Sequence, residues 1–212
     1  MNLKIGAWKR GSSEFPVQER DCLIWINHPN YSGDIAEGYD YALCYLDSPV
    51  VEYPNVTLVL NEDPEYPPTG TEATAIGMGY KTFFFGLPQY LQFTEVPIID
   101  TEDCGAQADE FGDTIICTAD PSTSTCSGDS GGPLVTIETL PSGDEVHTLI
   151  GLTSFGYGIF CPTSVSGFAR ISAGIEWIKD LVCGNNVEAS FCSADEFPGY
   201  DGSGPSSNPN LP

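Results

Sequence analysis

Hydrophobic and polar residues alternate over short stretches of this chain, and such alternation is typical of half-buried β-strands. The clearest example is the stretch 21–27. Its residues Cys22, Ile24 and Ile26 alternate with a second set, which is Leu23, Trp25 and Asn27. The same pattern, bounded by turn residues, predicts strands within 3–20 and at 41–46, 56–60, 74–78, 91–99, 113–118, 132–137, 145–154 and 166–171. Strand and turn therefore account for most of the chain.

Only one segment has the spacing of an amphipathic helix. Residues 173–182 place Ile175, Ile178 and Leu181 on one face. The strands follow one another without intervening helices, so their spacing predicts barrel or sandwich geometry and not parallel β-α-β units. The predicted fold class is all-β, with one helix close to the end.

Two segments rich in turn residues mark the organisation of the chain. The acidic segment 61–70 contains three prolines and is the best candidate for a junction between two halves. Beyond Cys192 the sequence consists mainly of Asp, Ser, Gly, Pro and Asn, a composition that cannot bury a core. We expect one domain over 1–193 and a disordered tail or linker over 194–212.

Composition excludes several classes of function. The 212 residues carry a formal net charge of −23, with 30 acidic residues against 7 basic ones. A chain so acidic has no basic surface for phosphates, which argues against nucleic-acid binding and favours cationic partners. No apolar run reaches the length of a transmembrane helix, so we expect no membrane span.

The eight cysteines are scattered, without a Cys-x-x-Cys pair or nearby histidine pairs that would predict zinc. An even set of this kind predicts four disulfides and an extracellular or secretory location. The sequons at Asn30 and Asn55 agree with secretion. No signal-peptide core follows Met1, so we expect the beginning of a secreted protein to be missing. If 21–27 and 41–46 pair as antiparallel strands, Cys22 and Cys44 could be bridged.

The candidate chemistry lies in 126–134, where Ser130 stands next to Asp129 in a glycine-rich turn. Such a turn exposes a hydroxyl together with backbone N–H groups, which suits a nucleophile with its own oxyanion site. The Gly-x-Ser-x-Gly pattern also fits the nucleophile elbow of an α/β-hydrolase, with Asp144 and His147 downstream. Only 17 residues separate Ser130 from His147, too few for the parallel strands and crossover helices of that fold.

The segment Gly-Asp-Ser-Gly-Gly-Pro-Leu, with Cys126 just before it, resembles the active-site segment of the trypsin/chymotrypsin family of serine endopeptidases. Further segments resemble that family in the same order, over about residues 3–183: His28 to Tyr31, Asp40 to Leu43, Gly77 to Gly79, Ser154 to Gly156, Phe168 to Ile171 and Trp177 to Ile178. The resemblance implies two six-stranded antiparallel barrels, the first incomplete here, and a C-terminal helix.

The resemblance also implies roles for individual residues. Ser130 is the expected nucleophile and Asp40 the carboxylate that orients the catalytic imidazole, as in the Ser-His-Asp triad. The N–H groups of Gly128 and Ser130 form the expected oxyanion hole. Asp129 is expected to pair with an amino terminus created by zymogen cleavage. The expected disulfides are Cys104–Cys117 and Cys126–Cys161, which leaves Cys22–Cys44 and Cys183–Cys192.

By the same resemblance, Ser124 lies at the base of the primary substrate pocket. The walls are assigned to Thr125, Ser154, Gly156 and Ser166 or Gly167. An Asp at the base would select Arg or Lys, and none is present. The small neutral lining predicts a chymotrypsin-like preference for large apolar or aromatic side chains.

The catalytic base is missing from this pattern. In the family it lies upstream of the Asp, in a Thr-Ala-Ala-His-Cys segment, and nothing similar precedes Asp40. His28 corresponds to a surface turn and His147 to a polar hairpin, so neither is the expected base. We expect an N-terminally truncated sequence in preference to a pseudoprotease, and an inactive, poorly stable chain with unpaired barrel edges.

The prediction is therefore a serine endopeptidase, with a non-catalytic binding module as the alternative. The expected partners are protein or peptide substrates and protein inhibitors, and the expected state is a monomer. We expect no cofactor and no metal site. The acidic residues 61–65 could hold calcium, but a solvated acidic surface is favoured because no ordered ligand spacing is visible.

Overall fold

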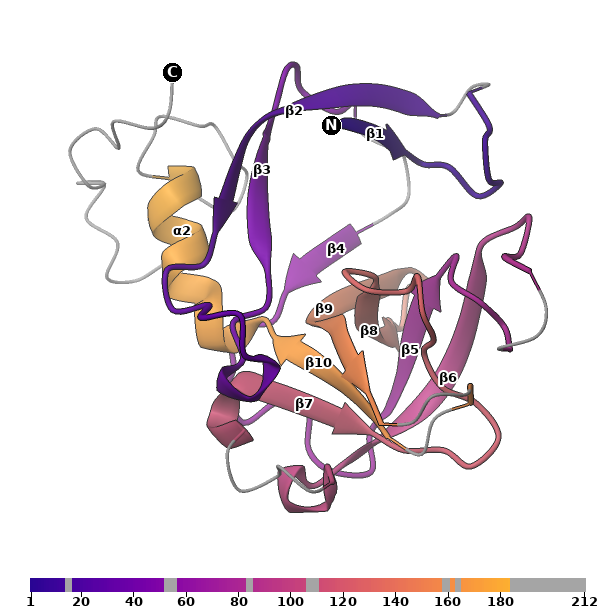
Figure 1. Ribbon diagram of the computed structural model, residues 1–212, viewed down its shortest axis with the longest axis vertical. Coiled ribbons are helices and arrows are strands. Elements are labelled where there is room, and N and C mark those ends of the chain that lie inside the picture. The colour runs from indigo at the N-terminus through magenta and orange to yellow at the C-terminus, as the bar shows by residue number, and fades with distance from the viewer. Residues whose placement is uncertain are drawn as a thin grey trace.

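The computed structural model describes residues 1–13, 17–51, 57–82, 86–105, 111–157, 161–162 and 165–183. The strands in this part of the chain (Figure 1) are β1 (Asn2–Ile5), β2 (Gln18–Asn27), β3 (Ala42–Leu46), β4 (Thr57–Leu60), β5 (Glu72–Gly77), β6 (Gln92–Ile99), β7 (Ile115–Thr118), β8 (Pro133–Thr139), β9 (Glu145–Gly156) and β10 (Ser166–Arg170). The helices are η1 (Ile35–Glu37), η2 (Thr101–Asp103), η3 (Gly112–Thr114) and η4 (Ser172–Gly174), all 3-10, and the α-helix α2 (Ile175–Cys183).

Six strands close into an antiparallel barrel. Their order is β10-β7-β6-β5-β8-β9, and β9 pairs again with β10 to complete the ring. Each of the six strands contributes to one buried cluster, made of Ala73, Ala75, Val96, Ile98, Ile116, Leu134, Ile150 and Phe168. The alternation seen in the sequence is thus the inward-facing set of a closed barrel, whose interior is filled by side chains.

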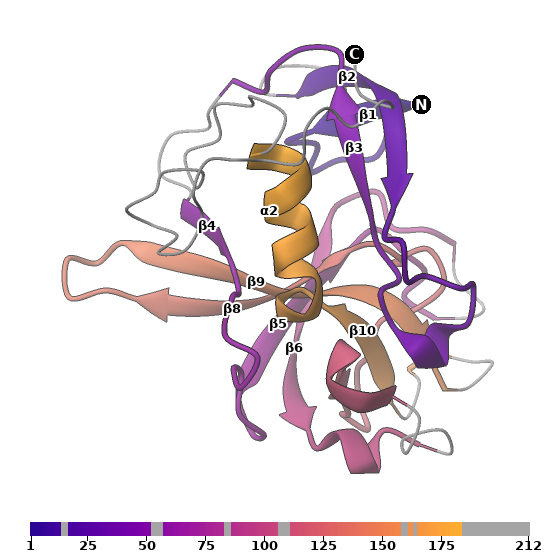
Figure 2. The same cartoon turned by 90° about the vertical axis from the view of Figure 1, so that its left-hand side faces the viewer.

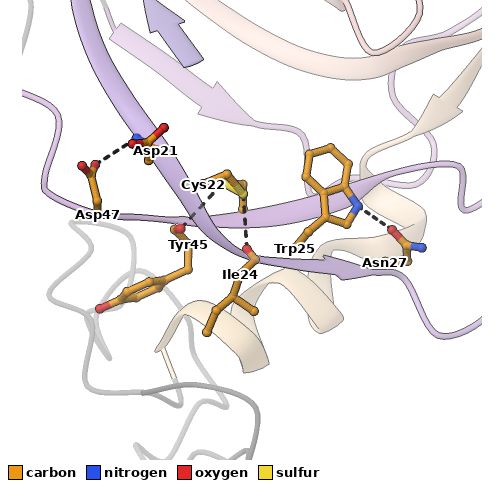
Figure 3. Close-up of a disulfide and its surroundings, with 8 residues drawn as sticks. Asp21, Cys22, Ile24, Trp25, Asn27, Tyr45 and Asp47 are labelled. Atoms are coloured by element: carbon orange, nitrogen blue, oxygen red, sulfur yellow. Dashed lines mark hydrogen bonds between the residues drawn. A yellow bond between two sulfur atoms is a disulfide. The ribbon is translucent and has the colours of Figure 1, made fainter. Parts of the chain in front are cut away.

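The first three strands form a separate antiparallel sheet in the order β1-β2-β3. On one face of β2, Leu23 and Trp25 are 58% and 57% exposed. Figure 3 shows the disulfide that joins β2 to β3, with the Trp25 indole N–H donating to Asn27 Oδ1 at 2.7 Å. Within the described residues, β1 and β3 each pair only with β2, so both outer edges of this sheet lack a strand partner.

Helix α2 lies beside the three-stranded sheet in both views of the molecule (Figures 1 and 2). Its Ile175 and Ile178 are buried. Trp177 packs on His28, with ring centroids 4.7 Å apart, at the end of β2. The helix therefore ties the first sheet to the second half of the chain, since η4 and β10 lead directly into it.

The predicted all-β fold with a C-terminal helix is confirmed, with a closed six-stranded barrel, a second sheet and α2. The segment 61–70 is not where the sheet changes, because β4 precedes it and already pairs in parallel with β9 through Val146 to Leu149. The change from the first sheet to the barrel sheet falls between β3 and β4. Among the described residues, no helix is long and apolar enough to cross a membrane.

Candidate active site

Ser130 lies in a tight turn between Cys126 and Gly132. The Asp129 N–H donates to the Cys126 carbonyl at 3.0 Å, and the Gly132 N–H donates to the Asp129 carbonyl at 2.7 Å. Gly128 has φ +94°, a left-handed conformation that favours glycine. A Cβ at Gly128 would also lie 3.2 Å from the Gly79 Cα, so the sequence needs glycine here for two reasons.

Two backbone donors of this turn remain unused. Within the described residues, neither the Gly128 N–H nor the Ser130 N–H donates a hydrogen bond. Ser130 itself is exposed. Gly128 is exposed as well, so both N–H groups can bind water or a ligand oxygen. A hydroxyl beside two such N–H groups is the arrangement that an oxyanion site requires.

The Asp129 carboxylate faces inward and accepts two backbone hydrogen bonds. Oδ1 accepts from the Gly79 N–H at 2.7 Å and Oδ2 accepts from the Cys126 N–H at 2.9 Å. Side chains at Gly77 or Gly79 would collide with this carboxylate, which explains the small residues on both sides of Met78. Asp129 thereby joins the Ser130 turn (126–132) to the loop that follows β5.

A cavity of about 240 Å³ adjoins the Ser130 turn, with Asp129 in its wall. The rest of the lining comes from the end of β5, the loop after it, β6 and the segment before Cys126: Ala75, Ile76, Gly77, Gly79, Tyr80, Lys81, Gln92, Phe93, Thr94, Thr123, Ser124 and Thr125. Phe93 is 74% exposed although it lines the cavity. The Asp129 side of the turn thus adjoins an open space large enough for a small chain segment.

Asp40 approaches the same region from the loop between η1 and β3. The Ser154 hydroxyl donates to Asp40 Oδ2 at 2.6 Å, across 114 residues of sequence. Thr153, the residue before Ser154 in β9, binds the Ser130 turn. Its N–H donates to the Gly132 carbonyl and its carbonyl accepts from the Gly131 N–H, both at 2.8 Å. Strand β9 therefore brings Asp40 and the Ser130 turn together.

Tyr31 is a further neighbour of Asp40. The negative charge of Asp40 raises the pKa of the Tyr31 phenol, with partial burial and a hydrogen bond to Asp40 adding to the effect. The sequence showed Tyr31 only as part of a His-Pro-x-Tyr loop. No local pattern predicts its contact with Asp40, because the loop between the two residues has to fold back first.

The two histidines lie in different surroundings. His28 is 5% exposed, its Nδ1 accepts the Asn30 N–H at 3.2 Å, and burial lowers its pKa. His147 lies on β9, where its Nε2 is 3.4 Å from Glu145 Oε2. Six residues of extended strand separate His147 from Thr153, which corresponds to about 20 Å.

Three of the residues assigned to the substrate pocket, Thr125, Gly156 and Ser166, lie close together. The Thr125 hydroxyl donates to Ser166 Oγ at 3.0 Å, and Ser166 pairs with Gly156 across β10 and β9. A side chain at Gly167 would collide with the ring of Phe155, one residue after Ser154. The segments 158–160 and 163–164, which flank this region, lie outside the described residues.

Three of the four expected disulfides are present. Cys22–Cys44, Cys104–Cys117 and Cys126–Cys161 have Cα–Cα distances of 5.6, 5.7 and 5.8 Å. These separations are in the usual range for disulfides. The expected partner of Cys183, which is Cys192, lies outside the described residues, as does the predicted tail 194–212.

A closed β-barrel carries a serine in a Gly-Asp-Ser-Gly-Gly turn, and its strand β9 also binds a carboxylate from the loop before β3. These features are those of the trypsin-like class of serine endopeptidases. Comparison with known proteins gives the same result. The Trypsin family model matches residues 1–178, and the chain belongs to the trypsin family.

Individual relatives agree with this assignment. The chain is 33% identical to "Trypsin" of Saccharopolyspora erythraea over 174 residues, 81% of this chain and 71% of that protein. It is 30% identical to "Fibrinolytic enzyme, isozyme C" of Lumbricus rubellus, over 84% of this chain and 77% of that protein. The chain is 32% identical to "Trypsin theta" of Drosophila melanogaster over 146 residues. This match covers 66% of this chain but only 52% of that protein.

Proposed function

We propose that this protein hydrolyses peptide bonds through an acyl-enzyme, with Ser130 as the nucleophile. The observation that carries the proposal is the pair of contacts made by β9. Thr153 binds the Ser130 turn and the adjacent Ser154 binds Asp40, so one strand aligns nucleophile and carboxylate. Membership of a family of serine endopeptidases supports the same reaction.

In the proposed reaction, Ser130 Oγ attacks the carbonyl carbon of the substrate and its proton passes to an imidazole. The N–H groups of Gly128 and Ser130 donate to the oxygen of the tetrahedral intermediate. The imidazolium then protonates the leaving amine, which leaves an acyl-enzyme that water hydrolyses. Asp40 stabilises the imidazolium and fixes its orientation, while the Ser154 hydroxyl holds Asp40.

We infer that the imidazole is not supplied by the 212 residues. His28 is buried with its Nδ1 occupied, and His147 is about 20 Å along β9 from the Ser130 turn. A general base must reach the serine hydroxyl by a hydrogen bond. The 212-residue chain alone is therefore inactive, and proteolysis at this site requires an imidazole from elsewhere.

Asp129 supports a second part of the proposal, the coupling of activation to the oxyanion site. Its carboxylate lines the cavity that adjoins the Ser130 turn, and a free amino terminus in that cavity would pair with it. Because Asp129 adjoins Gly128 and Ser130, such a pair would fix the two oxyanion donors in place. Residues 1–193 form the peptidase domain in this proposal, with 194–212 as a tail or linker.

The proposed primary specificity is chymotrypsin-like, for large apolar or aromatic side chains. Ser124, Thr125, Ser154, Gly156 and Ser166 carry no charge, and the hydrogen bond between Thr125 and Ser166 occupies two of the polar groups. A cationic substrate side chain would find no carboxylate among these residues. The three disulfides support an extracellular or secretory location, and a monomer with protein substrates and protein inhibitors is the proposed state.

Cleavage assays on the natural protein, purified with an antibody raised against this chain, test the function and the specificity together. Peptides that differ only in Phe, Leu or Arg before the scissile bond should be cleaved after Phe and Leu. Dominant cleavage after Arg would contradict the specificity. Absence of any cleavage would favour the alternative function, a non-catalytic homologue that binds through the same pocket.

A further inference from the structure

The backbone at Asp40 has an unusual conformation. Tyr39 has φ +54° and is the only non-glycine residue with positive φ in the described part of the chain. The Tyr41 N–H donates to the Tyr39 carbonyl at 2.8 Å, which closes a three-residue turn with Asp40 at its centre. A left-handed tyrosine is sterically disfavoured and persists only where its surroundings hold it.

The surroundings that hold Tyr39 are aromatic. Its ring stacks on the His28 ring, with centroids 4.4 Å apart and planes within 7° of parallel. The His28 ring in turn contacts the rings of Trp177 of α2 and Tyr41 edge-on. The ring centroids are 4.7 Å apart for Trp177 and 5.3 Å apart for Tyr41. The rings of Tyr39 and Tyr41, on either side of Asp40, are therefore both anchored on one buried histidine.

Packing fixes the same backbone from its other flanks. A side chain at Gly38 would collide with Thr114 of η3, and one at Gly174 of η4 would collide with the Tyr41 hydroxyl. The segment before Asp40 thus lies against the barrel and the segment after it lies against the start of α2. Between these two contacts, the Asp40 carboxylate accepts the Ser154 hydroxyl and acts on the Tyr31 phenol.

We propose that Tyr39 and His28 are positioning residues for Asp40: their ring stack stabilises the left-handed turn that directs the carboxylate to Ser154. The inference rests on the proposed role of Asp40 in proteolysis, and it adds two residues that touch no reacting atom. Removal of the stack should let Tyr39 return to an extended or helical conformation. That change would rotate Asp40 away from both of its partners.

Tyr31 supplies a measurement that does not depend on proteolysis. The Asp40 charge raises the pKa of the Tyr31 phenol, so the titration of Tyr31 reports whether Asp40 is in place. The 212-residue chain labelled with ¹³C at the tyrosine ring is titrated by NMR, and a Tyr31→Phe variant assigns the signal. Asp40→Asn calibrates the loss of the charge, and the Tyr31 pKa should fall toward its ordinary value.

The test compares Tyr39→Ala, which removes the ring and keeps the steric penalty of a left-handed backbone, with Tyr39→Phe, which keeps the ring. We expect Tyr39→Ala to lower the Tyr31 pKa as Asp40→Asn does, and Tyr39→Phe to leave it unchanged. His28→Asn keeps an acceptor for the Asn30 N–H, removes the stack and should act like Tyr39→Ala. It provides the same test if Tyr39→Ala does not fold.

Two results would overturn the inference. One is a folded Tyr39→Ala or His28→Asn variant in which the Tyr31 pKa equals that of the wild-type chain. The other is an unchanged Tyr31 pKa in Asp40→Asn, which would remove the contact on which the argument is built. Neither result bears on whether Ser130 is a nucleophile, so this inference and the proposed function fail separately.

Discussion

At the scale of single residues, the candidate site is organised by carboxylates that accept hydrogen bonds from fixed donors. Asp129 accepts from two backbone N–H groups and Asp40 accepts from the Ser154 hydroxyl. Hydrogen bonds to a charged group are stronger than those between neutral groups. Each carboxylate therefore fixes the segments that donate to it. For Asp129 these are the Gly79 loop and the start of the Ser130 turn, and for Asp40 the segment is the end of β9.

Burial of His28 should make the free energy of unfolding depend on pH. Burial lowers its pKa in the folded protein, so the unfolded chain binds a proton more readily. The stability that His28 contributes is complete above its unfolded pKa near 6.5 and is lost as pH falls from there toward the folded pKa. The titratable groups in contact with its ring are Tyr39 and Tyr41.

Urea unfolding at pH 7.5 and pH 5 measures this effect, with His28→Asn as the matched control. The wild-type chain should lose more unfolding free energy between the two pH values than the variant does. The carboxylates other than Asp40 have the same surroundings in both proteins and cancel in the comparison. Equal losses would show that His28 is as readily protonated in the folded chain as in the unfolded one.

Sequence alone placed together the candidate residues that are close along the chain. Ser130, Gly128 and Asp129 lie within one turn, and Gly128 permits its left-handed backbone, so a short pattern was sufficient to predict the turn. Their catalytic roles stay predictions. The contact of Tyr31 with Asp40 and the left-handed Tyr39 could not be predicted in this way. Both depend on how the loop between β2 and β3 packs against η3 and α2, and no spacing along the chain encodes that packing.

At the scale of elements, β9 organises the barrel and the site. It pairs with β8 and β10 on its two sides, and one end of it also pairs with β4. Near its other end, Thr153 binds the Ser130 turn and Ser154 binds Asp40. Alternating hydrophobic residues predicted the strand itself. They did not predict that β4 would pair with it in parallel, because pairing partners and direction are not visible in a single strand's pattern.

Close packing along β9 predicts a strong effect at Gly151. A Cβ there would lie 2.9 Å from the Phe168 Cβ, in the fully buried interior of the barrel. Gly151→Ala should therefore cost about 1–3 kcal/mol of unfolding free energy through overpacking. Urea denaturation followed by circular dichroism measures the loss.

Gly86→Ala is the control for this prediction. Nothing lies within 4 Å of a Cβ built at Gly86, and the residue is exposed. The control should change the unfolding free energy by less than about 0.5 kcal/mol. If both variants were equally stable, β9 and β10 would not be packed as closely as the structure has them.

Over the whole molecule, the two halves of the chain differ in how much apolar packing stabilises them. The barrel closes on itself around a buried cluster, whereas the β1-β2-β3 sheet contributes no residue to either buried hydrophobic cluster of the described part. Leu23 and Trp25 are more than half exposed. The net charge of −23 adds repulsion that disfavours compact structure.

Hydrogen exchange followed by mass spectrometry should detect this difference. Under non-reducing conditions, amides of β2 and β3 should exchange faster than those of β8, β9 and β10, because little apolar burial opposes local opening of the first sheet. The Cys22–Cys44 disulfide keeps β2 and β3 joined in both states. Equal protection of the two halves would contradict the account of an unsupported first sheet.

We propose that Ser130 is a protease nucleophile whose base is not among these 212 residues. Mass spectrometry of the adduct formed with a serine-directed phosphonate tests this proposal, on the protein isolated from its natural source and on the 212-residue chain side by side. We expect one phosphonate on Ser130 of the isolated protein and none on the chain alone. Modification of Ser130 in the chain alone, or an unmodified Ser130 in the isolated protein, would contradict the proposal.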